Sequence, residues 1–138
     1  MNTAEPDPAG PDEDIDTARV RLATAYLDAL LSHDARHVRF HPEAVRYEVG
    51  IKTGYSGKHL TASLNKGWQY RLVRTVHPPQ WTVQADTVTA RYRLDAGLAG
   101  FTLATRIVEV FRIPRDDLRI HRIDARIRVA RRHQHPDT

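Results

Sequence analysis

The chain has 138 residues, enough for one domain with a single core, and its lack of cysteine excludes disulfide bonds and thiolate metal sites. No apolar stretch approaches the roughly 18 residues of a membrane span, and the N-terminus has no signal-peptide pattern, so we expect a cytoplasmic protein without membrane contact. The net charge of +4 is uneven, because residues 1–16 hold six acidic residues and no Lys or Arg, which leaves +10 on the rest. The arginines are scattered through predicted strands rather than clustered on one helix, a pattern that does not favour nucleic-acid binding.

The first predicted element is a helix that follows an acidic tail. Residues 1–15 are rich in Pro, Asp and Ala, and such a segment buries too little apolar surface to fold, so we predict a disordered tail. From residue 16 to about residue 33, apolar side chains recur at spacings of three and four and form one stripe. Asp14 or Asp16 can cap the start of this helix. The apolar positions are Val20, Leu22, Ala23, Tyr26, Leu27, Leu30 and Leu31.

The first predicted strand spans residues 45–49 and follows a turn at residues 41–44. Because successive side chains of a strand point to opposite faces, Arg46 and Glu48 share one face and Tyr47 lies on the other. The sequence therefore predicts a carboxylate and a cation on the same side of this strand.

A second helix is predicted after a glycine-rich break at residues 54–57. Its apolar stripe holds Leu60, Leu64 and Trp68, and an extended segment at residues 70–76 comes after it.

Strands fill the second half of the chain and end in a polar tail at residues 131–138. Residues 81–84, 87–95, 101–114 and 118–129 alternate in character and are joined by short turns. The last three runs each carry an acidic residue: Asp95, Glu109 and Asp124. An acidic side chain in the middle of a strand is costly unless it faces water or lines a pocket that uses it. Helices followed by an antiparallel meander predict one α+β domain over residues 16–130, with the helices on one face of a curved sheet.

Four segments occur in a distinctive order: AYLDAL at 25–30, FHPEAV at 40–45, GYSG at 54–57 and VEVF at 108–111. Together they resemble the NTF2-like superfamily, in particular its SnoaL-like and ketosteroid-isomerase-like branch. The resemblance implies a cone-shaped barrel in which a curved, mainly antiparallel sheet wraps around the N-terminal helices. It also implies a homodimer formed through the sheet and an apolar pocket for a small hydrophobic molecule, such as a polyketide, terpenoid or steroid-like compound.

The isomerase pattern of this superfamily needs a tyrosine on the first helix, a carboxylate base on the first strand and a protonated acid on a later strand. The resemblance places Tyr26, Glu48 and Glu109 at these positions. Glu48 would move a proton next to a carbonyl while Tyr26 and neutral Glu109 donate hydrogen bonds to the enolate. The isomerases have aspartates at both acidic positions, and the longer side chains here shift each carboxyl group by roughly an ångström, a displacement that matters for catalysis.

A second pattern is that of the limonene epoxide hydrolases, with Arg-x-Asp on one strand and Asp on the last. Arg93, Asp95 and Asp124 match it, and the arginine would hold two carboxylates in opposite protonation states so that one activates water and the other protonates the epoxide. That family positions its water with a tyrosine and an asparagine, where this chain has Arg46 and Glu48. Neither pattern requires a cofactor.

Structural roles remain open for the same residues. Arg93, Asp95 and Asp124 can form ion pairs on an exposed sheet face, Tyr26 can be a core residue, and Glu109 shares a face with apolar side chains that would raise its pKa. Tyr47 and Trp68 are expected to pack and to line the pocket for substrate. The alternative to an enzyme is a non-catalytic ligand-binding or dimerisation module of the same fold.

Eight histidines suggest a metal site at first sight. His33, His37 and His41 are four residues apart, but Pro42 follows the last of them, so a shared helix face is not expected. No set of His and acidic residues has the spacing of a known motif, and we therefore expect neither a metal nor a cofactor.

Overall fold

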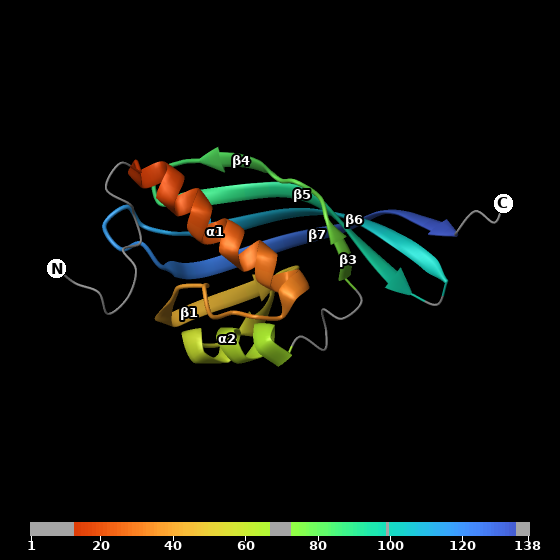
Figure 1. Ribbon diagram of the computed structural model, residues 1–138, viewed down its shortest axis with the longest axis horizontal. Helices are drawn as coiled ribbons and strands as arrows, with labels where there is room; N and C mark the ends of the chain where they lie inside the picture. The colour runs from red at the N-terminus through yellow and green to blue at the C-terminus, as the bar shows by residue number, and fades with distance from the viewer. Residues whose placement is uncertain (1–12, 67–72, 99, 135–138) are drawn as a thin grey trace.

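The computed structural model of the protein describes residues 13–66, 73–98 and 100–134, which form two helices and seven strands (Figure 1). The elements in chain order are α1 (Ile15–Ser32), β1 (Phe40–Glu48), β2 (Ile51–Gly54), α2 (Gly57–Lys66), β3 (Val73–Val76), β4 (Gln80–Val83), β5 (Thr87–Leu98), β6 (Phe101–Arg112) and β7 (Ile120–Gln134). The predicted α+β class is confirmed. Within the described residues, no helix combines the length and the apolar character needed to cross a membrane.

Helix α1 begins at a capping residue that the sequence indicates. Asp14 is the N-cap, and its Oδ1 accepts a hydrogen bond from the Thr17 N–H at 2.9 Å. This bond satisfies one of the N–H groups that a helix start leaves without an internal partner. The helix ends where His33 adopts a left-handed backbone, with φ of 57°, and donates its N–H to the Ala29 carbonyl. The first twelve residues of the predicted tail lie outside the described residues.

The strands form one open, mixed sheet in the order β2-β1-β7-β6-β5-β3, with β4 also paired to β5. All pairs are antiparallel except β1 with β7, which run parallel. In Figure 1, α1 crosses one face of the sheet, while α2 lies beside β1 at one edge. The curved sheet wrapped against the helices is the arrangement that the family resemblance implies.

Several strands differ from the predictions. β1 begins at Phe40, so the predicted turn at residues 41–44 belongs to the strand, and its register with β7 shifts between Phe40 and Val45 where Pro42 has no N–H to donate. β2 was not predicted, because four residues are too few to show a period. β7 continues to Gln134, which pairs with Phe101, so the first part of the predicted C-terminal tail is strand.

The tight turn between β1 and β2 has an unusual residue. Val49 and Gly50 both have positive φ, 53° and 79°. A two-residue hairpin turn with two positive φ values is common for Asn-Gly, but a β-branched residue in this conformation is strained.

The core lies between α1 and the sheet. Leu22 and Tyr26 of α1 contact a cluster that includes Phe111 and Ile123, all of them buried. Arg19 is also fully buried, and its guanidinium donates hydrogen bonds to the carbonyl oxygens of Ile113, Gln84 and Ala85 at 2.7, 3.1 and 3.0 Å. These bonds tie the first turns of α1 to the chain at the β4–β5 turn and the end of β6.

Candidate functional site

A cavity of about 240 Å³ lies between α1 and the face of the sheet that it covers, which we call the inner face. Its wall is mostly apolar and includes Leu30, Leu94 and Ile107. Tyr26, Glu48 and Glu109 are among the polar side chains that line the same space. The cavity therefore brings together all three residues of the isomerase pattern, although their roles stay predictions.

The register of the sheet explains why the two glutamates meet in the cavity. Glu48 of β1 and Glu109 of β6 both pair with Ala125 of β7, one from each side. All three side chains point to the inner face, and their strands are about 4.8 Å apart. Because Ala125 has only a methyl group, the space above it stays open between the two carboxyl groups.

Among the side chains that line the cavity, Glu109 has the pKa that differs most from its ordinary value. It is 3% exposed, and the Tyr92 hydroxyl donates a hydrogen bond to its Oε1 at 2.6 Å. Burial raises the pKa of Glu109 from 4.5 to about 7; the Tyr92 hydrogen bond acts in the opposite direction, while the nearby charge of Glu48 raises the value further. A carboxyl group in this environment can hold a proton at neutral pH and donate it.

Arg46 supplies a fixed positive charge next to the cavity. It is fully buried, and it donates to Thr53 Oγ1 at 3.0 Å and to the Tyr26 hydroxyl at 3.3 Å. Its Nε lies 3.8 Å from Oε2 of Glu48, which is partly exposed to the cavity. The sequence places Arg46 on the same face as Glu48 but does not show that its side chain is buried. Burial of the charged guanidinium costs free energy, and the hydrogen bonds of Arg46 offset this cost.

The residues of the epoxide-hydrolase pattern lie on the opposite, outer face of the sheet. Asp124 pairs with Arg122 at 2.7 Å, whereas Asp95 contacts Arg93 Nε at 2.9 Å and His77 Nε2 at 2.7 Å. Partial burial raises the pKa of Asp95, but the hydrogen bonds from His77 and Arg93 outweigh this effect and hold it below its usual value.

Asp95 and Asp124 are also too far apart to share an arginine. Asp124 is opposite Val110, which is opposite Thr89, six residues from Asp95 along β5. Six residues of strand span about 20 Å. The predicted bridge of Arg93 between two carboxylates is therefore wrong for this chain, and these acids form local ion pairs instead.

Of the two aromatic residues expected to line the pocket, the structure describes Tyr47. Tyr47 is on the outer face, where its ring contacts the guanidinium of Arg122 at 4.5 Å, so its expected place in the pocket is wrong. The alternation of β1 that puts Glu48 inside requires this outcome. Trp68 lies outside the described residues.

Tyr92 lines the cavity and was missed by the sequence reasoning. A signal existed, because the tight β5–β6 hairpin pairs Leu98 with Phe101 and therefore Tyr92 with Ile107, next to Glu109 on the same face. Counting residues back from the turn along both strands would have identified Tyr92 as a neighbour of Glu109.

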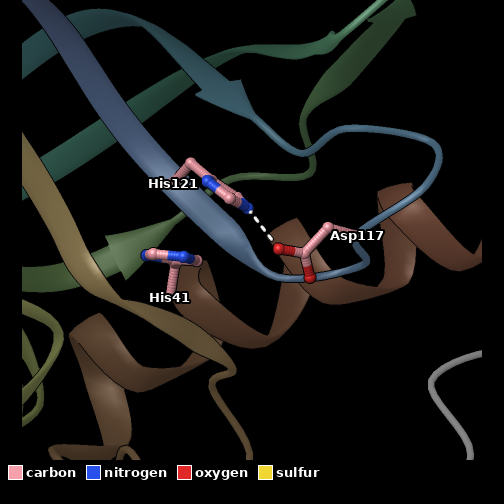
Figure 2. Close-up of side chains that lie close together, drawn as sticks. All are labelled: His41, Asp117 and His121. Atoms are coloured by element: carbon pink, nitrogen blue, oxygen red, sulfur yellow. Dashed lines mark hydrogen bonds and ion pairs between the residues drawn. The ribbon is translucent and has the colours of Figure 1, made fainter.

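A second polar cluster lies away from the cavity (Figure 2). His41 on β1, Asp117 in the β6–β7 connection and His121 on β7 each offer a ligand atom within 4.8 Å of the other two. His121 Nε2 lies 2.8 Å from Asp117 Oδ2. Hydrogen bonds from Arg119 lower the pKa of Asp117 to about 2, with a further contribution from His121. No metal is expected from the sequence, because among its neighbours in the chain His41 has no ligand partner at the spacing of a known motif.

Comparison with known proteins supports the fold. A family model described as "Domain of unknown function (DUF8021)" matches residues 13–127. No curated protein gives a significant match. The structure resembles an LEH-like epoxide hydrolase of M. tuberculosis, with 18% identity, a TM-score of 0.64, and coverage of 80% of this chain and 82% of that one.

Two further solved structures have the same architecture. An NTF2-like protein from Burkholderia xenovorans LB400 is 13% identical, with a TM-score of 0.64 and coverage of 80% of this chain and 88% of its own. A steroid delta-isomerase from Pseudomonas aeruginosa is 16% identical, with a TM-score of 0.59 and coverage of 87% and 84%. At these identities the similarity establishes a shared NTF2-like fold and leaves the chemistry to the residues of the cavity.

Proposed function

The chain belongs to the family of the domain of unknown function DUF8021 and has the NTF2-like fold, and from this premise we propose that its cavity binds a small hydrophobic molecule and transfers a proton within it without a cofactor. The observation that carries the proposal is Glu109, a buried carboxyl group with a pKa near 7, in an apolar cavity that it shares with Glu48. Paired carboxyl groups in unlike environments are typical of acid–base catalysis.

The residues can be given complementary roles. Glu48, with the guanidinium of Arg46 beside it, is the base that takes a proton from a carbon next to a carbonyl group. Protonated Glu109 and the hydroxyl of Tyr26 are the donors that stabilise the resulting enolate oxygen, and the Tyr92 hydroxyl orients Glu109 through its hydrogen bond to Oε1. Return of the same proton from Glu48 to another carbon gives an isomer, so no atom is gained or lost.

The size of the cavity narrows the class of ligand. About 240 Å³ is below the roughly 300–1,000 Å³ of sites that hold drug-sized molecules. We therefore propose a compound of one or two rings, such as a small cyclic ketone, rather than a four-ring steroid.

A non-catalytic binding module is the second candidate. It is favoured by the fact that Glu109 and Glu48 already have protein partners, Tyr92 and Arg46, which would stabilise both carboxyl groups without any reaction. In this case the cavity would bind the same apolar compounds without exchanging their protons.

Deuterium exchange distinguishes the two candidates. Cyclohex-2-enone is incubated with the protein in D₂O, and loss of the proton signals next to the carbonyl is followed by NMR. We expect exchange above the buffer rate, and a decrease of about 10²-fold or more in Glu48→Gln, the range typical for loss of a general base, with thermal stability nearly unchanged. Glu43→Gln, an exposed position on the same strand, and Asp124→Asn on the outer face are the matched controls and should exchange at the wild-type rate.

Two results would count against catalysis. If the enone raises the melting temperature but is not exchanged, the cavity only binds ligand. If Asp124→Asn loses exchange while Glu48→Gln keeps it, the reaction depends on the outer face and the proposed site is wrong.

We also propose that two copies associate through the outer face of β5, β6 and β7. Val108 and Val110 of β6 are half-buried there, and Tyr47 lies across β7 from them. A homodimer of this kind would leave the cavity on the inner face open to ligand.

A further inference from the structure

We propose that His41, Asp117 and His121 bind a divalent transition-metal ion of the Zn²⁺ class. The three residues do not line the proposed catalytic cavity, so this site stands independently of the proposed reaction. They are brought together by elements that are far apart in the chain, and each offers one ligand atom within 4.8 Å of the other two.

The backbone places the two histidines side by side. β1 and β7 pair in parallel with Phe40 opposite Ile120, and the rings of the next residues, His41 and His121, are in contact. Their ring centroids are 4.3 Å apart and the planes are tilted by 30°. Figure 2 shows both rings on one side of Asp117, with His121 directed at the carboxylate. Two imidazoles at this separation on paired strands are already close to a shared coordination sphere.

Asp117 is held in place by its own turn. Its N–H donates to the Pro114 carbonyl at 3.2 Å, and its carbonyl accepts from the Arg119 N–H at 2.8 Å. Since the backbone of the turn is fixed at both ends, the carboxylate stays next to His121 without help from a metal.

The distances require small adjustments to become those of a metal site. Zn²⁺ bonds of about 2.0–2.2 Å in a tetrahedron put ligand atoms about 3.3 Å apart. The Nε2 of His121 and Oδ2 of Asp117 are 2.8 Å apart and share a proton, so a metal that replaces this proton needs them to separate by about half an ångström. His41 must turn its ring toward them, which gives up the hydrogen bond from the exposed Glu43 N–H at 3.0 Å.

Arg119 lowers the affinity of the site for a metal ion but does not block the site. Its Nε and Nη2 donate hydrogen bonds to the two carboxylate oxygens of Asp117, at 2.8 and 2.9 Å. A carboxylate has about four acceptor positions, and Arg119 uses one on each oxygen. The position that His121 now uses on Oδ2 is the one that a metal would take. The guanidinium also repels a cation, so replacing it should strengthen binding.

The ligand types select the ion. Two imidazoles and one carboxylate suit Zn²⁺ and Co²⁺, whereas Mg²⁺ and Ca²⁺ prefer oxygen ligands alone. All three side chains are only partly buried, which leaves a fourth position for water, as in zinc sites with three protein ligands.

Zn²⁺ titration of the full chain, without an affinity tag, tests the proposal by calorimetry. We expect one equivalent to bind, with affinity decreased at least tenfold in His41→Gln, Asp117→Asn and His121→Gln. The matched control is His77→Gln, which removes a histidine from another His–Asp pair, at 2.7 Å, and should keep the wild-type affinity. Co²⁺ should give visible absorption bands with the wild type and lose them in the three ligand variants.

Circular dichroism checks that each variant is folded. Arg119→Gln keeps all three ligands, and we expect it to bind Zn²⁺ more tightly than the wild type. The proposal is overturned if the wild type takes up no equivalent of Zn²⁺, if the three ligand variants keep its affinity, or if His77→Gln loses affinity to the same degree. Bands of Co²⁺ that persist in His121→Gln would likewise assign the metal to other histidines.

Discussion

Glu109 is the residue on which the proposed chemistry of the cavity depends, and its burial also makes the stability of the protein depend on pH. Its pKa of about 7 in the folded state is higher than its ordinary value of 4.5. The folded protein therefore binds more protons than the unfolded chain between these values, and stability falls as the pH rises through this window. Above about pH 7, the charged carboxylate remains buried and its cost is fully present.

Glu109→Gln should remove this dependence, because an amide has no charge to bury. A pKa difference of 2.5 corresponds to on the order of 3 kcal/mol. Between pH 4.5 and pH 8, the free energy of unfolding of the variant should therefore rise by about this much relative to that of the wild type. Urea unfolding at several pH values measures the difference. Parallel stability curves for the two proteins would show that Glu109 titrates normally.

At the scale of elements, the β1–β2 hairpin carries a strain that the sequence alone does not reveal. Val49 has φ of 53° at the turn and is 62% exposed, so its side chain gains little from packing. A left-handed backbone costs a residue with a Cβ roughly 1–2 kcal/mol, and Asn tolerates it better.

Val49→Asn should therefore stabilise the protein by about 1 kcal/mol. The melting temperature measures this gain, which is several degrees for a domain of this size. Ile51→Asn is the control, because Ile51 is similarly exposed but belongs to the strand β2, where Asn is unfavourable. A gain in the control but not in Val49→Asn would mean that exposed apolar area, rather than backbone strain, is the cause.

Sequence periodicity predicted the elements well where they are long. The apolar stripe and Asp14 predicted α1 almost to the residue, and alternation predicted β5 and β6 and put Glu109 with Ile107 on one face. Alternation could not say which face α1 covers, so Asp95 and Asp124 stayed open between a place in the pocket, as in the hydrolase pattern, and ion pairs on an exposed face.

Pairing between distant strands is what the sequence could not provide. Ala125 between Glu48 and Glu109, and His121 beside His41, follow only from the parallel register of β1 with β7. Such pairings depend on the whole sheet rather than on local pattern, and Pro42 made the start of β1 resemble a turn.

For the whole molecule, the distribution of charge determines how two copies can meet. The outer face of β5, β6 and β7 carries the arginines 91, 93, 106, 112, 122, 126 and 128, against the acids Asp95 and Asp124. Two such faces repel each other in dilute salt, and salt screens this repulsion. The proposed dimer should therefore become tighter as ionic strength increases.

Light scattering coupled to size-exclusion chromatography measures this effect. Between about 0.05 M and 0.5 M NaCl, over which the screening length falls from above 10 Å to about 4 Å, we expect the mass to shift toward twice 15.8 kDa. Val110→Lys, which adds charge at the centre of the face, should keep the chain monomeric, whereas Lys58→Glu on α2 should not. A wild-type protein that stays monomeric in both salts would exclude the dimer.

The parallel pairing of β1 with β7 also has a consequence for the order of folding. It joins Phe40 to Ile120 and Glu48 to Ala125, residues about 80 positions apart, and contacts of such long range form slowly. The β5–β6 hairpin can close early because its strands are joined by a tight turn. Glu48 reaches the cavity, and His41 reaches His121, only when this last pairing forms. Ligand binding and Zn²⁺ binding should therefore both report completed folding, and neither should be present in an intermediate that contains only the β5–β7 meander.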